Sequence, residues 1–363
     1  MNKFFTTIIA LAAASSVAWA GNPDRQGEAG AYELLINPWA RSAGLHTMYT
    51  SGIKGAEAMQ LNPAGISRIA RTEIALGHTK YLVGTGININ SLGFATKISK
   101  GGTLGISLML MDFGDIERTT VDNPEGQIGT FSPNFSNIGI SYGYMFANKI
   151  SVGATVRLAN ESLSNVSARA TALDAGIQYV TGDKEHNDKF KFGISLRNVG
   201  TKMVFRGQGL SIPRPNPDGT FNYNVSYYSR GAEYNLPSQL NIGLSYDIYL
   251  GGSSDKFAHR VTVVGNFVSN AFSRDNLGAG LEYGLGENFA LRAGYKYELG
   301  LTTSSTDATV DTGIAAGATF LTPFKRGSKS NLAIDYSWRQ TNQWNGIHNL
   351  ALRINLGGSK ADD

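Results

Sequence analysis

Apolar and polar side chains alternate one by one along much of this chain. Residues 288–300, NFALRAGYKYELG, put Phe289, Leu291 and Tyr295 on one side of an extended chain and Arg292, Lys296 and Glu298 on the other. Successive side chains of a β-strand point to opposite faces of the sheet, so the pattern predicts a strand with two different faces. In a soluble sandwich the aromatic face would form the core. In a membrane barrel it would meet lipid, and the charges would line the interior.

The same alternation recurs, with turn signals in between, from residue 71 to residue 357. Each run is about ten residues long, the length that a tilted strand needs to cross a bilayer. Bacterial outer-membrane barrels use an even number of strands. The fourteen candidate strands are centred on 71–79, 86–98, 103–112, 134–147, 149–159, 168–180, 188–198, 236–250, 257–269, 275–286, 288–300, 308–320, 330–340 and 347–357.

The connections between these strands differ in length at the two expected ends of the sheet. Those after even-numbered strands are short, whereas several after odd-numbered strands are long, namely 113–133, 199–235 and 301–307. Outer-membrane barrels have short periplasmic turns and long extracellular loops, and a soluble sandwich has no reason for such parity. The sequence therefore predicts an all-β fold, a transmembrane antiparallel β-barrel of about fourteen strands. Both chain ends are expected on the short-turn side.

Composition supports an exported membrane protein. Glycine accounts for 44 of 363 residues and only 17% of residues are charged, whereas soluble proteins average about 7% glycine and about 25% charged residues. The chain has no cysteine, so disulfides and thiolate metal sites are excluded. A net charge of +4 is too small to indicate nucleic acid as a partner.

With the aromatic face assigned to lipid, the strand charges point into the barrel. An Arg or Lys that faces lipid near the midplane would cost about 2–4 kcal/mol. Because the inward charges have mixed signs, they can pair with one another and with a plug. The expected lumen-facing charges are Arg157, Arg197, Asp247, Glu282, Arg292, Lys296, Glu298, Asp335, Arg339 and Arg353.

The first seventy residues do not follow the strand pattern. Residues 1–20 combine a positive start, a short apolar run and Ala18-Trp19-Ala20, which is typical of a cleaved signal peptide. Residues 21–70 have helix-compatible and turn-forming stretches, and their apolar content argues against disorder. We expect them to form an N-terminal plug, or hatch, inside a barrel of residues 71–357, followed by a polar C-terminal tail, 358–363.

Two motifs in this segment carry a family resemblance. They are Leu35-Ile36-Asn37-Pro38-Trp39-Ala40-Arg41-Ser42-Ala43-Gly44 and Asn62-Pro63-Ala64-Gly65. Residues 33–66 resemble the start of the PorV/PorQ family of Bacteroidota outer-membrane proteins, a branch of the FadL-like barrels. Asn62-Pro63-Ala64 is similar to an Asn-Pro-Ala element of the FadL-like hatch. The resemblance implies a plugged fourteen-stranded barrel in the outer membrane of a Gram-negative, Bacteroidota-type cell.

Two functions remain open for such a barrel. The resemblance implies an accessory subunit of an outer-membrane protein export or assembly machine, such as a type IX secretion translocon or a barrel-assembly complex. Its partners would be outer-membrane lipid, that larger complex and exported protein cargo. A tyrosine-rich loop with Tyr223, Tyr227, Tyr228 and Tyr234 fits a partner-binding surface. The alternative is a FadL-like transporter of hydrophobic small molecules.

Enzyme chemistry is not expected. Gly139-Ile140-Ser141-Tyr142-Gly143 matches the spacing of a nucleophile elbow, but that motif needs a strand-to-helix turn and these residues lie in mid-strand. The five histidines are scattered, without an i, i+4 pair for a metal. We therefore expect no catalytic residues, no metal and no cofactor.

Overall fold

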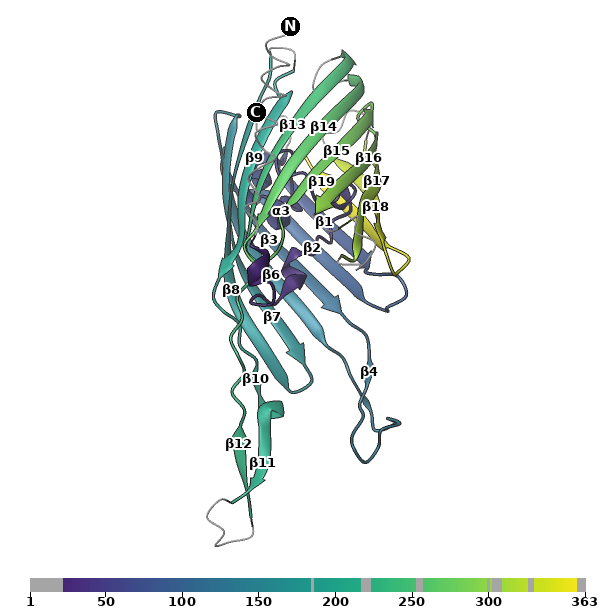
Figure 1. Ribbon diagram of the computed structural model, residues 1–363. Coiled ribbons are helices and arrows are strands. Elements are labelled where there is room, and N and C mark those ends of the chain that lie inside the picture. The colour runs from purple at the N-terminus through teal and green to yellow at the C-terminus, as the bar shows by residue number, and fades with distance from the viewer. Residues whose placement is uncertain are drawn as a thin grey trace.

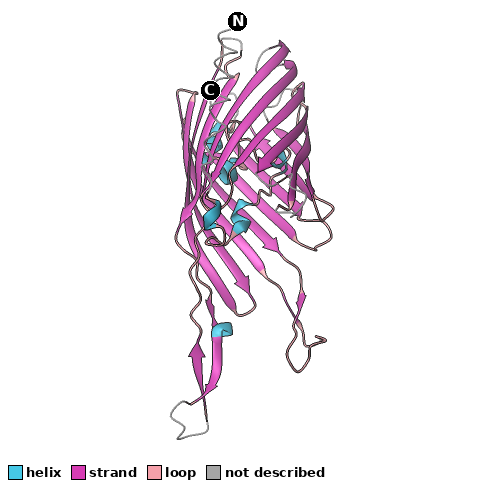
Figure 2. Ribbon diagram, viewed as in Figure 1, coloured by secondary structure: helices cyan, strands magenta, loops and turns pink. Residues whose placement is uncertain are grey.

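The computed structural model describes residues 22–183, 186–216, 223–252, 257–298, 301, 309–325 and 330–357. Within these residues, fourteen long antiparallel strands form one barrel (Figures 1 and 2). The expected fold class and strand number are confirmed. The strands are β1 (Thr72–Lys80), β2 (Asn88–Lys97), β3 (Gly102–Asp112), β6 (Asn134–Phe146), β7 (Ile150–Leu163), β8 (Val166–Thr181), β9 (Phe190–Gly200), β13 (Gln239–Gly252), β14 (Phe257–Asn270), β15 (Asn276–Leu285), β16 (Phe289–Glu298), β17 (Asp311–Pro323), β18 (Asn331–Thr341) and β19 (Ile347–Leu356).

The barrel is closed by its first and last strands. β1 pairs with β19 along its whole length, from Thr72 opposite Leu356 to Lys80 opposite His348. Each of the other long strands pairs with its sequence neighbours, and β10 (Arg206–Gly207) adds a short extra pairing to β8. Closure gives every strand two partners, so the sheet has no free edge to aggregate or to meet lipid unpaired.

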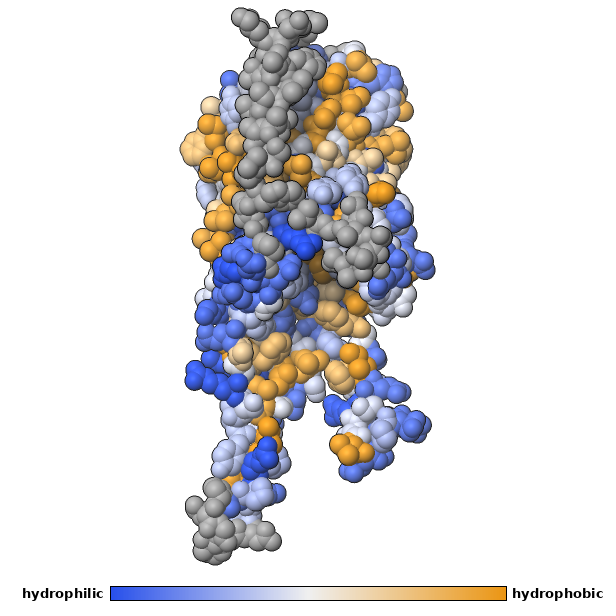
Figure 3. All heavy atoms as spheres, viewed as in Figure 1, coloured by the Kyte–Doolittle hydropathy of each residue, from blue (hydrophilic) through white to orange (hydrophobic). Residues whose placement is uncertain are grey.

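The two faces of the wall have opposite character. On β16 the side chains of Leu291 and Tyr295 are 46% and 43% exposed, whereas that of Arg292 is 7% exposed. Other strands repeat this pattern, and Figure 3 shows hydrophobic side chains spread over the barrel wall. The aromatic face of β16 therefore lies outside, where an apolar surface fits a bilayer and would be unfavourable in water.

The long connections project from one end of the barrel. Residues 113–133 contain β4 (Ile116–Glu117) and β5 (Thr130–Phe131), and residues 201–238 contain β10, η5 (Gln208–Leu210), β11 (Ser211–Pro215) and β12 (Asn224–Tyr228). Figure 1 shows both extending well beyond the barrel on the same side. The connections at the other end include short turns at 98–101, 147–149 and 286–288. We call these the long-loop end and the short-turn end.

We expect the long-loop end to face the cell exterior, and single cysteines test this in a chain that has none of its own. In intact cells a membrane-impermeant thiol reagent should label Gln208→Cys in η5 but not Glu287→Cys in the β15–β16 turn. Labelling of both after the outer membrane is permeabilised is the control for reactivity. Labelling of Glu287→Cys alone in intact cells would contradict the orientation. Three other loop positions suit this test but lie outside the described residues: Ser254, Asp307 and Ser328. The expected signal peptide and the expected C-terminal tail also lie outside the described residues.

The N-terminal segment lies inside the barrel. It contains η2 (Pro23–Arg25), η3 (Tyr32–Leu35), α2 (Ala40–Ala43), α3 (Ala58–Leu61) and η4 (Pro63–Arg68), and most of its residues from 34 to 67 are buried. η4 packs against β6, β7 and β8, and α2 against β17, β18 and β19. Among the described residues, no helix is long and apolar enough to span a membrane.

This segment runs in the direction opposite to the one expected. The amide N–H groups of Gly30 and Asn235 donate to the carbonyls of Asn235 and Glu28, both at 3.0 Å, and Arg25 stacks over Phe272. Asn235 and Phe272 lie in connections at the long-loop end. The segment then passes through the lumen and reaches β1 at the short-turn end. The expectation that the N-terminal segment starts on the short-turn side is therefore wrong for the described residues.

Candidate functional site

The Asn62-Pro63-Ala64-Gly65 motif fixes the plug to the barrel wall. The Asn62 side chain is fully buried, accepts a hydrogen bond from the Ala64 amide, and donates to the carbonyls of Thr50 and of Ile177 in β8. Pro63 suits the first position of η4 because it needs no amide donor there. Gly65 lies so close to Ile53 that an added Cβ would be 2.2 Å from the Ile53 carbonyl oxygen. The motif thus has a structural role in positioning the plug.

Barrel side chains satisfy the irregular backbone of the plug. Gln178 donates to the carbonyl of Ile53 at 2.8 Å, and Ser195 donates to that of Leu61 at 2.8 Å. Arg157 donates to the carbonyl of Met59. A buried carbonyl without a partner is costly, and the short plug helices leave many carbonyls without helical partners. The inner face of the barrel therefore acts as the hydrogen-bond partner of the plug.

The expected lumen charges form two sets of ion pairs. A continuous chain of charged and hydroxyl side chains crosses six neighbouring strands, β14 to β19. Its members contact one another in the order Arg260, Glu282, Arg292, Thr319, Asp335 and Arg353. Separate ion pairs lie on the neighbouring strands: Asp247 of β13 pairs with Lys191 of β9, and Arg157 of β7 pairs with Asp174 of β8 at 2.5 Å. These pairs neutralise charges that would otherwise be buried alone.

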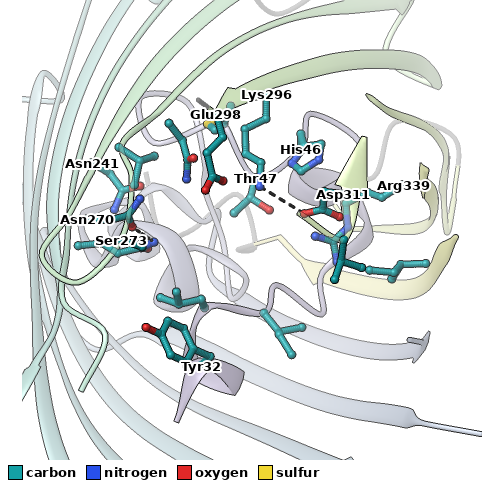
Figure 4. Close-up of a pocket in the computed structure, with 18 of the residues that line it drawn as sticks. Tyr32, His46, Thr47, Asn241, Asn270, Ser273, Lys296, Glu298, Asp311 and Arg339 are labelled. Carbon is teal, nitrogen blue, oxygen red and sulfur yellow. Dashed lines mark hydrogen bonds and ion pairs between the residues drawn. The ribbon is translucent and has the colours of Figure 1, made fainter. Parts of the chain in front are cut away.

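Four expected charges belong to a different feature. Lys296, Glu298 and Arg339 line a cavity of about 310 Å³ at the long-loop end of the lumen. Lys296 pairs with Asp311 of β17 at 3.3 Å. Arg197 also lines the cavity, and its guanidinium donates to the carbonyl of Leu34 at 3.3 Å. Figure 4 shows His46, Lys296, Asp311 and Arg339 on one side of the cavity and Asn241, Asn270 and Ser273 on the other.

His46 and Asp311 were missed as cavity residues by sequence reasoning. Asp311 could have been found, because it lies on the inward face of a recognised strand, two positions before Gly313 and four before Ala315. His46 lies in the irregular plug and has φ 51°, so no periodicity indicated its direction. Its side chain is 2% exposed, and burial lowers the pKa of the imidazole to about 3. His46 is therefore neutral at physiological pH.

An apolar cluster lies beside the cavity. Leu34 of η3 is fully buried in a cluster that includes Met109, Met111, Phe135 and Met203. Met109 and Met111 come from the long-loop end of β3, and Phe135 from the start of β6. Methionine side chains are flexible and can repack around apolar groups of different shape. The long-loop half of the lumen thus offers an apolar contact region next to a polar cavity.

The tyrosine-rich loop divides into two parts. Tyr223, Tyr227 and Tyr228 belong to the projecting β11–β12 hairpin and are 54%, 48% and 55% exposed. Tyr234 is instead half-buried at the barrel, where its hydroxyl donates to Glu161 at 2.7 Å and its ring packs near Phe205. Tyr234 therefore lies at the wall and not on the projecting hairpin, because the chain has already returned to the wall at this point.

Ser141 lies on the inner face of β6. Its hydroxyl is 2.6 Å from that of Thr155 on β7, and the residue is buried. The strand continues on both sides of it, so the turn that a nucleophile elbow needs does not occur here. Among the described residues, no group of three His, Cys, Asp or Glu side chains could hold a metal ion.

Comparisons with known proteins find similarity only in structure. No protein-family model and no curated protein sequence matches the chain. The CymD monoaromatic hydrocarbon channel matches with 13% identity and a TM-score of 0.51 over 88% of this chain and 97% of that chain. A deletion mutant of the TodX monoaromatic hydrocarbon channel gives the same four values. A Pseudomonas aeruginosa FadL homologue has 12% identity over 88% and 97% of the chains, but its TM-score of 0.49 is too low for an argument.

At this level of identity the comparisons show the fold alone. The chain shares with these proteins the fold of a fourteen-stranded antiparallel β-barrel, and its apolar outer face suits contact with a bilayer. CymD and the TodX mutant are both monoaromatic hydrocarbon channels by name. The comparisons show this barrel fold and do not test the PorV/PorQ resemblance in particular.

Proposed function

We propose that the protein is a plugged channel through which small hydrophobic molecules cross the outer membrane. The observation that carries this proposal is the fold, shared over most of both chains with two solved monoaromatic hydrocarbon channels. The lumen agrees with it, because a cavity and a methionine-rich apolar cluster lie together at the long-loop end. A molecule that arrives from outside would meet both before it passes the rest of the plug.

Passage then requires the N-terminal segment to move, because this segment fills the lumen below the cavity. Ala29 and Asn235 form a parallel bridge between the segment and the wall at the long-loop end. Cysteines at these two positions can therefore be joined without other thiols interfering. We expect toluene uptake by cells that express the oxidised Ala29→Cys, Asn235→Cys protein to fall severalfold and to recover after reduction.

Two controls define the outcome of this uptake experiment. The single variant Ala29→Cys should take up toluene like the unaltered protein under both redox conditions. Cells without the protein set the baseline for diffusion through the membrane. Uptake at that baseline in cells that express the unaltered protein would contradict the transport function. Equal uptake by the oxidised and reduced double variant would show that uptake does not require the start of the segment to move away from Asn235.

A second candidate function is that of a subunit in a larger outer-membrane machine. The β11–β12 hairpin favours it, because it stands clear of the barrel in Figure 1 and exposes Ile212, Tyr227 and Tyr228. Tyrosine is enriched at protein interfaces. The resemblance of residues 33–66 to the PorV/PorQ family points the same way and would place the protein in a Bacteroidota-type membrane. Its partner would be a type IX secretion translocon, a barrel-assembly complex or exported cargo.

Co-purification in mild detergent distinguishes the two candidates. A subunit should bring a stoichiometric outer-membrane partner with it, and deletion of residues 209–228 should release that partner while the barrel still folds. A barrel that purifies alone, and whose loss reduces uptake of hydrophobic compounds without affecting protein export, would contradict the subunit function.

A further inference from the structure

The cavity contains buried polar groups that have no partner. Arg339 is 7% exposed, and neither its Nε nor its Nη2 atom has a hydrogen-bond partner within the described part of the chain. The same holds for Nε2 of His46, Nδ2 of Asn241 and Oδ1 of Asn276. All four residues line the cavity. A buried donor left unpaired costs about 1–3 kcal/mol, and more when it is charged, so these groups are suited to a bound molecule.

The unpaired groups lie at two separate ends. Arg339 and His46 are on the side that also contains the Lys296–Asp311 pair, as Figure 4 shows. Asn241 is on the opposite side, with Asn270 and Ser273. Asn270 already bonds to Gln239 and to the Arg274 carbonyl, which leaves Asn241 as the free amide donor of this group. The first end offers the cationic guanidinium of Arg339, and the second end offers a neutral amide donor.

Charge favours an anion at the Arg339 end. The described cavity lining has three permanent cations, Arg197, Lys296 and Arg339, and two carboxylates, Glu298 and Asp311. Lys296 is engaged with Asp311, and Arg197 with a carbonyl and an amide oxygen. Arg339 has no ion pair at 4 Å or less among the described residues. A carboxylate could accept two parallel hydrogen bonds from its guanidinium, the geometry that arginine favours.

Apolar side chains also line the cavity. The lining includes Leu35 and Ile36 from the plug, Val268 from β14 and Ile347 from β19. Such a wall favours a hydrocarbon body over a chain of hydroxyl groups. A hydrocarbon without a polar group would fill the same volume but would leave Arg339 and Asn241 unpaired.

We infer that the cavity binds a small organic acid with an apolar body and a second polar group at its far end. The carboxylate lies against Arg339, and the second polar group lies against Asn241. This inference rests on the proposed transport function only in treating the cavity as the first site that a solute reaches. It adds a substrate class that the neighbours' names do not contain.

Three rigid ligands test the inference on purified protein in detergent by isothermal titration calorimetry. 4-Hydroxybenzoate carries both polar groups, benzoate lacks the hydroxyl, and p-cresol replaces the carboxylate by a methyl group. We expect 4-hydroxybenzoate to bind most tightly and p-cresol at least tenfold more weakly, because hydrogen bonds to charged groups contribute about 1.5–3 kcal/mol. Equal binding of p-cresol would overturn the inference, as would the absence of binding by all three ligands.

Two variants assign the ends of the site. Arg339→Gln should weaken 4-hydroxybenzoate and benzoate binding roughly tenfold or more, because it removes the charge. Asn241→Ala should remove the advantage of 4-hydroxybenzoate over benzoate and leave benzoate unchanged. Arg169→Gln is the matched control, since Arg169 is an exposed arginine of β8 that bonds to Asn160. Heat-modifiable gel mobility confirms that each variant is a folded barrel.

The results separate this inference from the transport proposal. Unchanged 4-hydroxybenzoate binding by Arg339→Gln would overturn the inference, because the carboxylate would not lie at Arg339. Toluene uptake in cells does not depend on that binding result. Loss of uptake function with intact acid binding would contradict transport and leave the cavity assignment standing.

Discussion

Replacement of Asp174 by alanine is expected to destabilise the folded barrel by about 3–5 kcal/mol, the cost of leaving a buried charge without its partner. Asp174 is fully buried on β8, accepts a hydrogen bond from Nε of Arg157 at 2.5 Å, and accepts another from the Asn198 amide at 2.7 Å. Arg157 is 1% exposed, so water cannot replace the lost carboxylate. The same arginine holds the Met59 carbonyl of the plug. The change should therefore loosen both the wall and the plug.

Urea unfolding in lipid vesicles, followed by heat-modifiable mobility, measures this effect. Asp122→Ala is the matched control, because Asp122 is exposed in the 113–133 connection. Asp174→Asn keeps an acceptor oxygen without the charge and should give an intermediate loss of stability. Equal stability of Asp174→Ala and Asp122→Ala would show that the buried pair does not support the fold.

A lysine on the outer face should be harmful in proportion to its depth in the membrane. Leu281 lies in the middle of β15 and is 53% exposed, and Leu285 lies at the end of the same strand and is 46% exposed. We expect Leu281→Lys to cost about 2–4 kcal/mol and Leu285→Lys about 0–1 kcal/mol, the range known for lysine at the midplane and near the interface. Leu291→Lys on β16 should fall between them.

This series separates a membrane barrel from a soluble one. In water both leucines would be surface residues, and lysine would be tolerated equally at either position. The measurement is the folded fraction after refolding into vesicles, compared with refolding of the unaltered protein. Similar folded fractions for Leu281→Lys and Leu285→Lys would mean that lipid does not cover the middle of the outer face.

The sequence by itself determined the wall of this barrel and its two faces. Period-2 alternation is a local property, since each side chain's direction follows from its neighbours in the same strand. Arg292 could therefore be assigned to the lumen and Leu291 to the outside without knowing which strands pair. The even number of strands and the parity of the long connections were likewise visible in order along the chain.

The tertiary structure alone decided which groups meet. Arg157 and Asp174 are 17 positions apart, and Arg157 and the Met59 carbonyl are 98 positions apart. Such contacts depend on the register between strands and on the path of the plug. The plug has no repeating pattern, so neither its direction through the lumen nor the position of His46 could be predicted. The position of Tyr234 at the wall could not be predicted for the same reason, because loop composition does not show where a chain returns to the wall.

The cavity illustrates the difference most clearly. Alternation predicted that Lys296, Glu298 and Arg339 point inward, and they do. Whether an inward charge has a partner depends on residues from other strands and from the plug. Lys296 forms an ion pair with Asp311, whereas Nε and Nη2 of Arg339 have no hydrogen-bond acceptor in the described part of the chain. The strand pattern thus fixed the direction of each side chain, and only the closed barrel around its plug decided which of them are left free to bind a ligand.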